Sequence, residues 1–113
     1  MSNNTMQHLE TCLKNSMNGR VNNDDLNVLI QNESLLIYDP VASINAITVN
    51  MESRDCFKIF VMKGEKAKIH LQTMVDMLQI IFEELNQMNA RYGVSLCDTQ
   101  DQMFNNVNKS NVK

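Results

Sequence analysis

The sequence predicts an α+β fold: a short N-terminal helix, an antiparallel meander of three to four strands, and a long C-terminal amphipathic helix. Three observations predict it. Apolar residues recur at helical spacing near the N-terminus, alternate with polar residues in the middle of the chain, and return to helical spacing towards the C-terminus. The chain has 113 residues, about the length of one domain. We therefore expect one domain over residues 1–97 and a polar, flexible tail over residues 98–113.

The first helix is expected over residues 4–18. Its apolar stripe recurs at steps of three and four residues: Met6, Leu9, Leu13 and Met17. Asn18 and Gly19 follow, and these are the residue types that most readily adopt the left-handed conformation at a helix end.

Four segments then show the alternation that is typical of strands. Their expected ranges are 26–31, 35–38, 43–51 and 56–62. The turns between them are short and polar, which favours antiparallel neighbours because parallel strands need long crossovers. The fourth segment is apolar on both faces, so a second layer should cover the face that bears Phe60 and Met62. We expect a partner or a second copy to bind there.

The last helix is expected from Glu65 to Tyr92, ending at Gly93. Its apolar residues form a heptad seam: Leu71, Met74, Leu78, Ile81, Leu85, Met88 and Tyr92. Val75 and Phe82 widen this seam into a stripe. A helix of about 28 residues spans about 42 Å, more than four short strands can cover. The stripe can therefore cover one face of the chain's own sheet, and the helix length in excess of that sheet predicts a coiled-coil dimer or a bound partner.

No catalytic, metal or cofactor site is expected. His8 and Cys12 have the i, i+4 spacing of two metal ligands on a helix, but two ligands do not make a site. A third would have to be His70, Cys56 or Cys97, all distant and without a supporting motif. The cysteines also lack an adjacent base in the sequence, and the three glycines are too far apart to form a phosphate loop.

The formal net charge is −3, which disfavours a nucleic-acid partner because phosphate binding needs clustered cations. One segment, residues 54–68, departs from this balance with five basic residues against Asp55 and Glu65. The five are Arg54, Lys58, Lys63, Lys66 and Lys68. A small nucleic-acid-binding subunit that uses this segment to bind anions is the alternative hypothesis.

The chain shows neither a signal-peptide pattern nor an apolar stretch long enough for a membrane span, and its three cysteines are widely spaced. An intracellular location, in cytoplasm or nucleus, is expected. The order helix, antiparallel strands, long helix resembles that of small acidic dimeric secretion chaperones, of adaptor subunits, and of the RNA-binding pair of signal recognition particle proteins. The first two resemblances imply a chaperone or adaptor role.

Three function classes therefore compete. The first, which the seam favours, is a non-catalytic interaction or scaffold module. The second is the nucleic-acid-binding subunit, and the third is a small enzyme, which would need a polar pocket.

Overall fold

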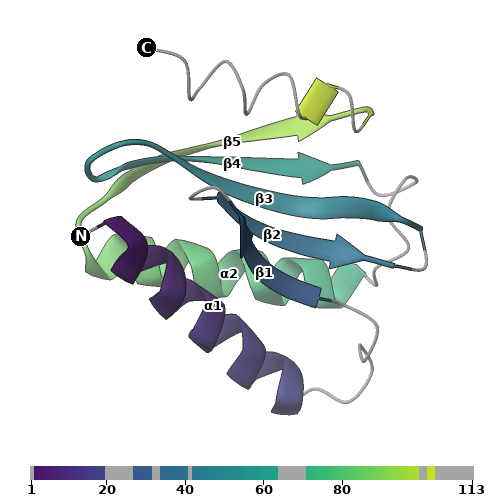
Figure 1. Ribbon diagram of the computed structural model, residues 1–113, viewed down its shortest axis with the longest axis horizontal. Coiled ribbons are helices and arrows are strands. Elements are labelled where there is room, and N and C mark those ends of the chain that lie inside the picture. Colours follow the sequence, from purple (N-terminus) through teal and green to yellow (C-terminus); the bar gives the residue numbers. More distant parts are fainter. Residues whose placement is uncertain are drawn as a thin grey trace.

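Two helices cover one face of a five-stranded sheet in the computed structural model of this protein (Figure 1). The structure describes residues 2–19, 27–31, 34–40, 42–63, 71–99 and 102–103. The elements follow the order α1 (Ser2–Gly19), β1 (Asn27–Gln31), β2 (Ser34–Asp39), β3 (Ile44–Ser53), β4 (Cys56–Met62), α2 (Leu71–Gln87) and β5 (Arg91–Cys97). The first helix and the first four strands lie close to where the apolar spacing placed them.

The sheet is mixed. Strands β1 to β4 form consecutive antiparallel pairs, as their short connections require. Strand β5 then pairs with β4 in parallel, and α2 supplies the crossover that a parallel pair needs. The spatial order β1-β2-β3-β4-β5 leaves β1 and β5 as the two edges of the sheet.

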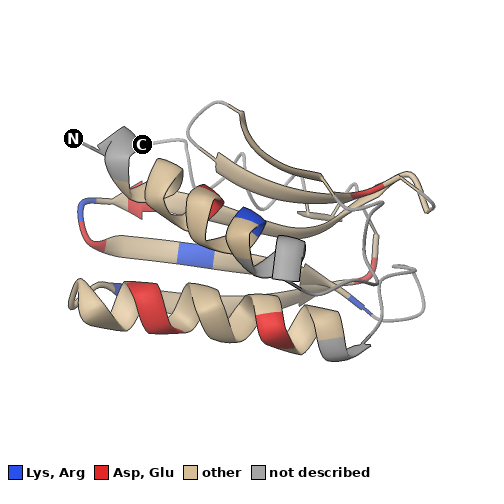
Figure 2. Cartoon of the chain, turned by 90° about the horizontal axis from the view of Figure 1, so that it is seen from below, with Lys and Arg blue, Asp and Glu red and all other residues tan. Residues whose placement is uncertain are grey.

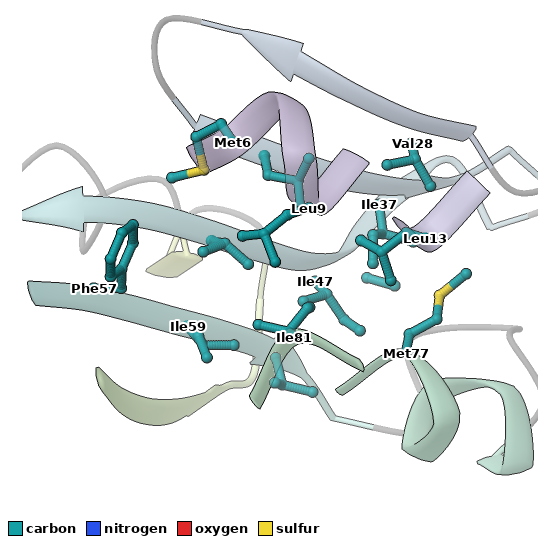
Figure 3. Packing of buried hydrophobic residues seen from close by; sticks show 14 of the residues in the cluster. Met6, Leu9, Leu13, Val28, Ile37, Ile47, Phe57, Ile59, Met77 and Ile81 are labelled. Atoms are coloured by element: carbon teal, nitrogen blue, oxygen red, sulfur yellow. The ribbon is translucent and has the colours of Figure 1, made fainter. Parts of the chain in front are cut away.

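The main core lies between the sheet and the two helices (Figure 3). Alternation places one side of each strand in this layer, so Ile37, Ile47 and Ile59 point towards the helices and are fully buried. Leu9 and Leu13 of α1 meet them from the helix side, as the helical spacing predicted. A helix stripe and a set of strand faces are thus buried in one continuous cluster.

A second, smaller cluster covers the opposite face of the sheet. Phe60 and Met62 of β4 pack there with Cys97 and Met103, and all four are buried. The Thr48 hydroxyl also donates to the Met103 sulfur at 3.2 Å. The expected second layer over Phe60 and Met62 is therefore supplied, at least in part, by residues of the same chain.

The predicted fold class is wrong in its last third. No long C-terminal helix is present among the described residues: α2 has 17 residues, and the segment expected to form its last turn and its end is strand β5. The three- and four-residue spacing of apolar positions continues past the end of the helix by coincidence. Met88 lies in the turn after α2, and Tyr92 lies in β5. The sheet is consequently a mixed one and not the meander that the sequence predicted.

Asn89, rather than Gly93, ends α2. Its φ of 58° is in the left-handed region. The Ala90 N–H bonds to the Leu85 carbonyl and the Asn89 N–H to the Asn86 carbonyl, both at 3.0 Å, which is the Schellman pattern at a helix end. This cap turns the chain directly into β5.

We expect Asn89→Gly to preserve or slightly raise stability and Asn89→Ala to lower the free energy of unfolding by about 1 kcal/mol. Glycine adopts positive φ without strain, whereas the alanine side chain is strained in the left-handed conformation. Urea unfolding of the two variants beside wild type measures the difference. Equal stability of the two variants would show that the cap conformation is not required.

The coiled-coil expectation is also wrong. At about 1.5 Å per residue, the 17 residues of α2 span about 26 Å, well short of the length that the sequence predicted. The seam residues Met74, Ile81 and Leu85 are 8%, 0% and 0% exposed and belong to the main core, as does Met77. Among the described residues, no helix is long and apolar enough to cross a membrane.

Candidate functional site

The residues predicted to bind a partner are buried or partly buried wherever their side chains are described. Leu78 and Met88 pack partly buried against the main core, beside the three buried seam residues named above. Phe60 and Met62 are 3% and 1% exposed. Leu71 begins α2, but its side chain lies outside the described residues. The hydrophobic signal that we assigned to a partner is thus used largely by the chain's own fold.

The predicted basic segment is only partly described, because Lys66 and Lys68 lie outside the described residues. Lys58 approaches Glu52 at 3.9 Å, and exposed Lys63 bonds Asp98 at 2.9 Å. That bond and the Asp98 charge raise the pKa of Lys63 above its ordinary value. Figure 2 shows the described Lys and Arg residues placed singly on several elements. Two of the segment's three described cations therefore already have carboxylate partners.

The outer edge of β5 is the first candidate site. The Arg91 N–H bonds to the Asp55 carbonyl at 2.8 Å, and the Cys97 carbonyl accepts the Lys63 N–H at 3.1 Å, so these two β5 residues direct their backbone towards β4. Alternate residues of a strand direct their backbone groups to opposite sides. Tyr92, Val94 and Leu96 therefore present their N–H and C=O groups away from β4, and no other described strand pairs with that edge.

Two of the three side chains on this edge, Val94 and Leu96, are apolar and exposed, whereas Tyr92 packs partly buried against the main core. Val94 is 47% exposed and Leu96 63%, and Val75 of α2, the other large hydrophobic residue that is exposed in the described part of the chain, is 47% exposed. We call Val75, Val94 and Leu96 the edge patch.

The stacking of Phe82 on Tyr92, with ring centroids 5.2 Å apart, places one face of α2 against β5. Val75 lies two helical turns before Phe82 on that face, and the chain reverses direction between α2 and β5. Helix geometry thus places Val75 towards the Leu96 end of the strand.

Strand β5 has few of the features that protect sheet edges from pairing. It has seven residues, no proline or lysine, no register shift in its ladder with β4, and one charged residue, Arg91. Sequence reasoning missed this edge because Arg91 and Tyr92 were assigned to the end of a helix, and Val94 and Leu96 to the irregular segment after it. The alternation of Tyr92, Val94 and Leu96 after Asn89 was the signal that would have found it.

The second candidate site lies between the two helices, where three ligand-type side chains converge. His8 and Cys12 of α1 meet Glu84 of α2. The His8 Nε2 atom lies 2.7 Å from Glu84 Oε1 and 3.7 Å from Cys12 Sγ. Helical spacing placed His8 beside Cys12, but Glu84 lies 76 residues from His8 and only the fold brings it there. Spacing in the sequence thus indicated the first two residues and not the third.

This arrangement does not resemble an activated cysteine nucleophile. A catalytic histidine uses one ring nitrogen for the nucleophile and the other for the orienting carboxylate. Here the same nitrogen, Nε2, faces both Cys12 and Glu84. Burial first, and then the Glu84 charge and hydrogen bond, raise the pKa of the Cys12 thiol, which disfavours the reactive thiolate.

Comparison of this chain with protein-family models, with curated proteins and with solved structures finds no match. The resemblances drawn from the order of elements lose their basis with the long helix. Function is therefore inferred from the geometry of the chain itself.

Proposed function

We propose that this protein is a non-catalytic interaction module that assembles by pairing the free edge of β5 with the same edge of a second copy. The observation that carries the proposal is made on the described part of the chain: at Val94 and Leu96, backbone groups that pair with no other described strand coincide with exposed apolar side chains. An edge strand with both features is a template for another strand. Pairing would continue the sheet across the two chains and cover the edge patch.

A second copy fits this edge because the outward-facing residues are self-complementary in antiparallel register. With Val94 on the two-fold axis, Val94 meets the partner's Val94. Tyr92 then lies opposite the partner's Leu96, and each such aromatic–aliphatic pair contributes about 0.2–1 kcal/mol. An isologous contact of this kind closes after two copies, so a dimer is the expected product.

The charges at the two ends of β5 are compatible with the same register. Arg91 begins the strand, and Asp98 follows its last residue. Antiparallel pairing brings Arg91 of one chain near the partner's Asp98, and the relation is repeated at the other end. Exposed ion pairs add little stability, but these favour the antiparallel over the parallel orientation, in which like charges would meet.

We further propose an intracellular location. Cys12 and Cys56 are in the thiol form, and thiols persist in a reducing compartment.

The test is to replace Val94 with proline and measure the molar mass in solution. Proline removes the outward N–H and blocks an added strand, yet it breaks no bond to β4 because that N–H points away. We expect wild type to sediment at about twice the chain mass of 13.0 kDa at high micromolar concentration, and Val94→Pro to remain folded and monomeric.

Val94→Thr is the matched control, because it keeps the backbone N–H and β-branched shape while removing apolar surface. We expect it to weaken the dimer without abolishing it. A wild-type monomer under these conditions would overturn the proposal, and so would a dimer that survives Val94→Pro. A complex in which another protein's extended segment takes the edge would also replace self-pairing as the function.

A further inference from the structure

The convergence of His8, Cys12 and Glu84 on one point has no role in the assembly proposed above. The three side chains come from both helices, and their ligand atoms all lie within 4.8 Å of one another. The His8 side chain is 57% exposed and that of Glu84 19% exposed, so the cluster is open to solvent. A nitrogen, a sulfur and a carboxylate oxygen thus face each other at the surface junction of α1 and α2.

We propose that these three residues form a binding site for one zinc-type divalent metal ion. In a tetrahedral zinc site with bonds of about 2.0–2.3 Å, the ligand atoms lie about 3.3–3.7 Å apart. Cys12 Sγ and His8 Nε2 already have this separation at 3.7 Å. His8 Nε2 and Glu84 Oε1, at 2.7 Å, need to open by less than about 1 Å, which side-chain rotation supplies.

The position of the imidazole nitrogen favours a metal ion over a histidine that only joins the two helices by a hydrogen bond. A single Nε2 atom directed at both Cys12 and Glu84 is what coordination to one central ion requires. A cation at the centre would also offset the unfavourable proximity of the Glu84 carboxylate to the Cys12 sulfur. The hydrogen bond between His8 and Glu84 is then the metal-free form of the site.

The donor set selects the class of metal. A thiolate with an imidazole suits zinc and similar transition ions, whereas calcium and magnesium prefer oxygen ligands alone. Three protein ligands leave the fourth tetrahedral position for water or for a group of a bound molecule. Because its ligands come from α1 and α2, the ion would join the N-terminal helix to the crossover helix.

Zinc titration of the full-length reduced chain tests the proposal, with competition against a chromogenic chelator to measure affinity. We expect one ion per chain with a dissociation constant in the micromolar range or tighter. Cys12→Ser and Glu84→Gln should each weaken binding by more than about 100-fold, since losing even an outer-sphere partner of a metal ligand costs about 10–100-fold. His8→Gln should do the same.

Cys56→Ser is the matched control, because Cys56 is also a half-buried thiol beside a carboxylate, Glu52 at 3.8 Å. It should bind zinc as wild type does. Cobalt supplies a second readout: bound Co²⁺ should show thiolate-to-metal absorption that disappears in Cys12→Ser. Circular dichroism checks that each variant is folded, and His8→Gln stands in for any variant that is not.

Two results would overturn the proposal. One is the absence of zinc binding by folded wild type at micromolar concentrations. The other is binding that Cys12→Ser and Glu84→Gln leave unchanged. Since the ligands lie on the helices, zinc should also raise the melting temperature of wild type by several degrees and leave that of Glu84→Gln unchanged.

Discussion

Replacing Ile81 with alanine is expected to lower the free energy of unfolding by about 2–5 kcal/mol. Ile81 is fully buried in the main core, which it shares with Leu9, Ile47 and Ile59, so the substitution leaves a cavity in that core (Figure 3). A small domain has a total stability of about 5–15 kcal/mol, so this loss is a large share of it. Urea unfolding followed by circular dichroism measures the change.

Gln79→Ala is the control for this prediction, because Gln79 lies on the same helix and is exposed. It should change stability by less than about 0.5 kcal/mol. If Ile81→Ala were as mild as Gln79→Ala, the heptad seam would not face the sheet, and the helix would be free to pack on a partner.

Replacing Met103 with alanine is expected to cost about 2–5 kcal/mol as well, on the opposite face of the sheet. Met103 is completely buried against Phe60 and Met62 and accepts the Thr48 hydroxyl. Met103→Leu, which nearly conserves volume, should cost less than about 1.5 kcal/mol. Denaturant midpoints of the two variants beside wild type give the comparison.

A chain that ends at Asp98 should be destabilised at least as much as Met103→Ala, since it loses the whole cover that Met103 provides. The polar composition of the tail predicted the reverse, namely that residues from 98 onwards form a flexible segment. Wild-type stability of the shortened chain would restore that prediction and show that the second cluster forms without Met103.

The helix α1 and strands β1 to β4 were predictable because their signals are local. Leu9 and Leu13 have helical spacing, and Phe57 and Ile59 are separated by one residue that points to the other face of the sheet. Polar turns bound each of these elements. Such patterns indicate which side of a helix or strand is buried. They do not indicate whether that side is buried by the same chain or by a partner. For this reason the seam of α2 was interpreted as a coiled-coil surface.

The end of α2 and the existence of β5 were not predicted because two periods overlap there. Met88 and Tyr92 continue the three-and-four spacing of the helix, and Tyr92 also begins the alternation of a strand. The helix ends at Asn89, which adopts the left-handed conformation. In a sequence, asparagine indicates a helix end less strongly than glycine does, so Gly93 was taken as the end. Because β5 was not predicted, the sheet edge proposed for assembly was not predicted either.

The sequence predicts only part of the cluster of His8, Cys12 and Glu84. Four-residue spacing on a helix predicts the contact between the first two side chains, but Glu84 reaches them only through the packing of α2 beside α1. No rule of spacing links residues so far apart, so the third ligand needed the tertiary structure.

The most direct test of self-assembly through β5 is amide hydrogen exchange resolved for individual residues, measured across a range of protein concentrations. If β5 pairs with its copy, the outward N–H groups of Tyr92, Val94 and Leu96 should become protected as concentration rises. The inward N–H of Arg91, bonded to Asp55, should be protected throughout. Fast exchange of the Val94 amide at a concentration where the protein is dimeric would contradict the account, because the dimer would then use another surface.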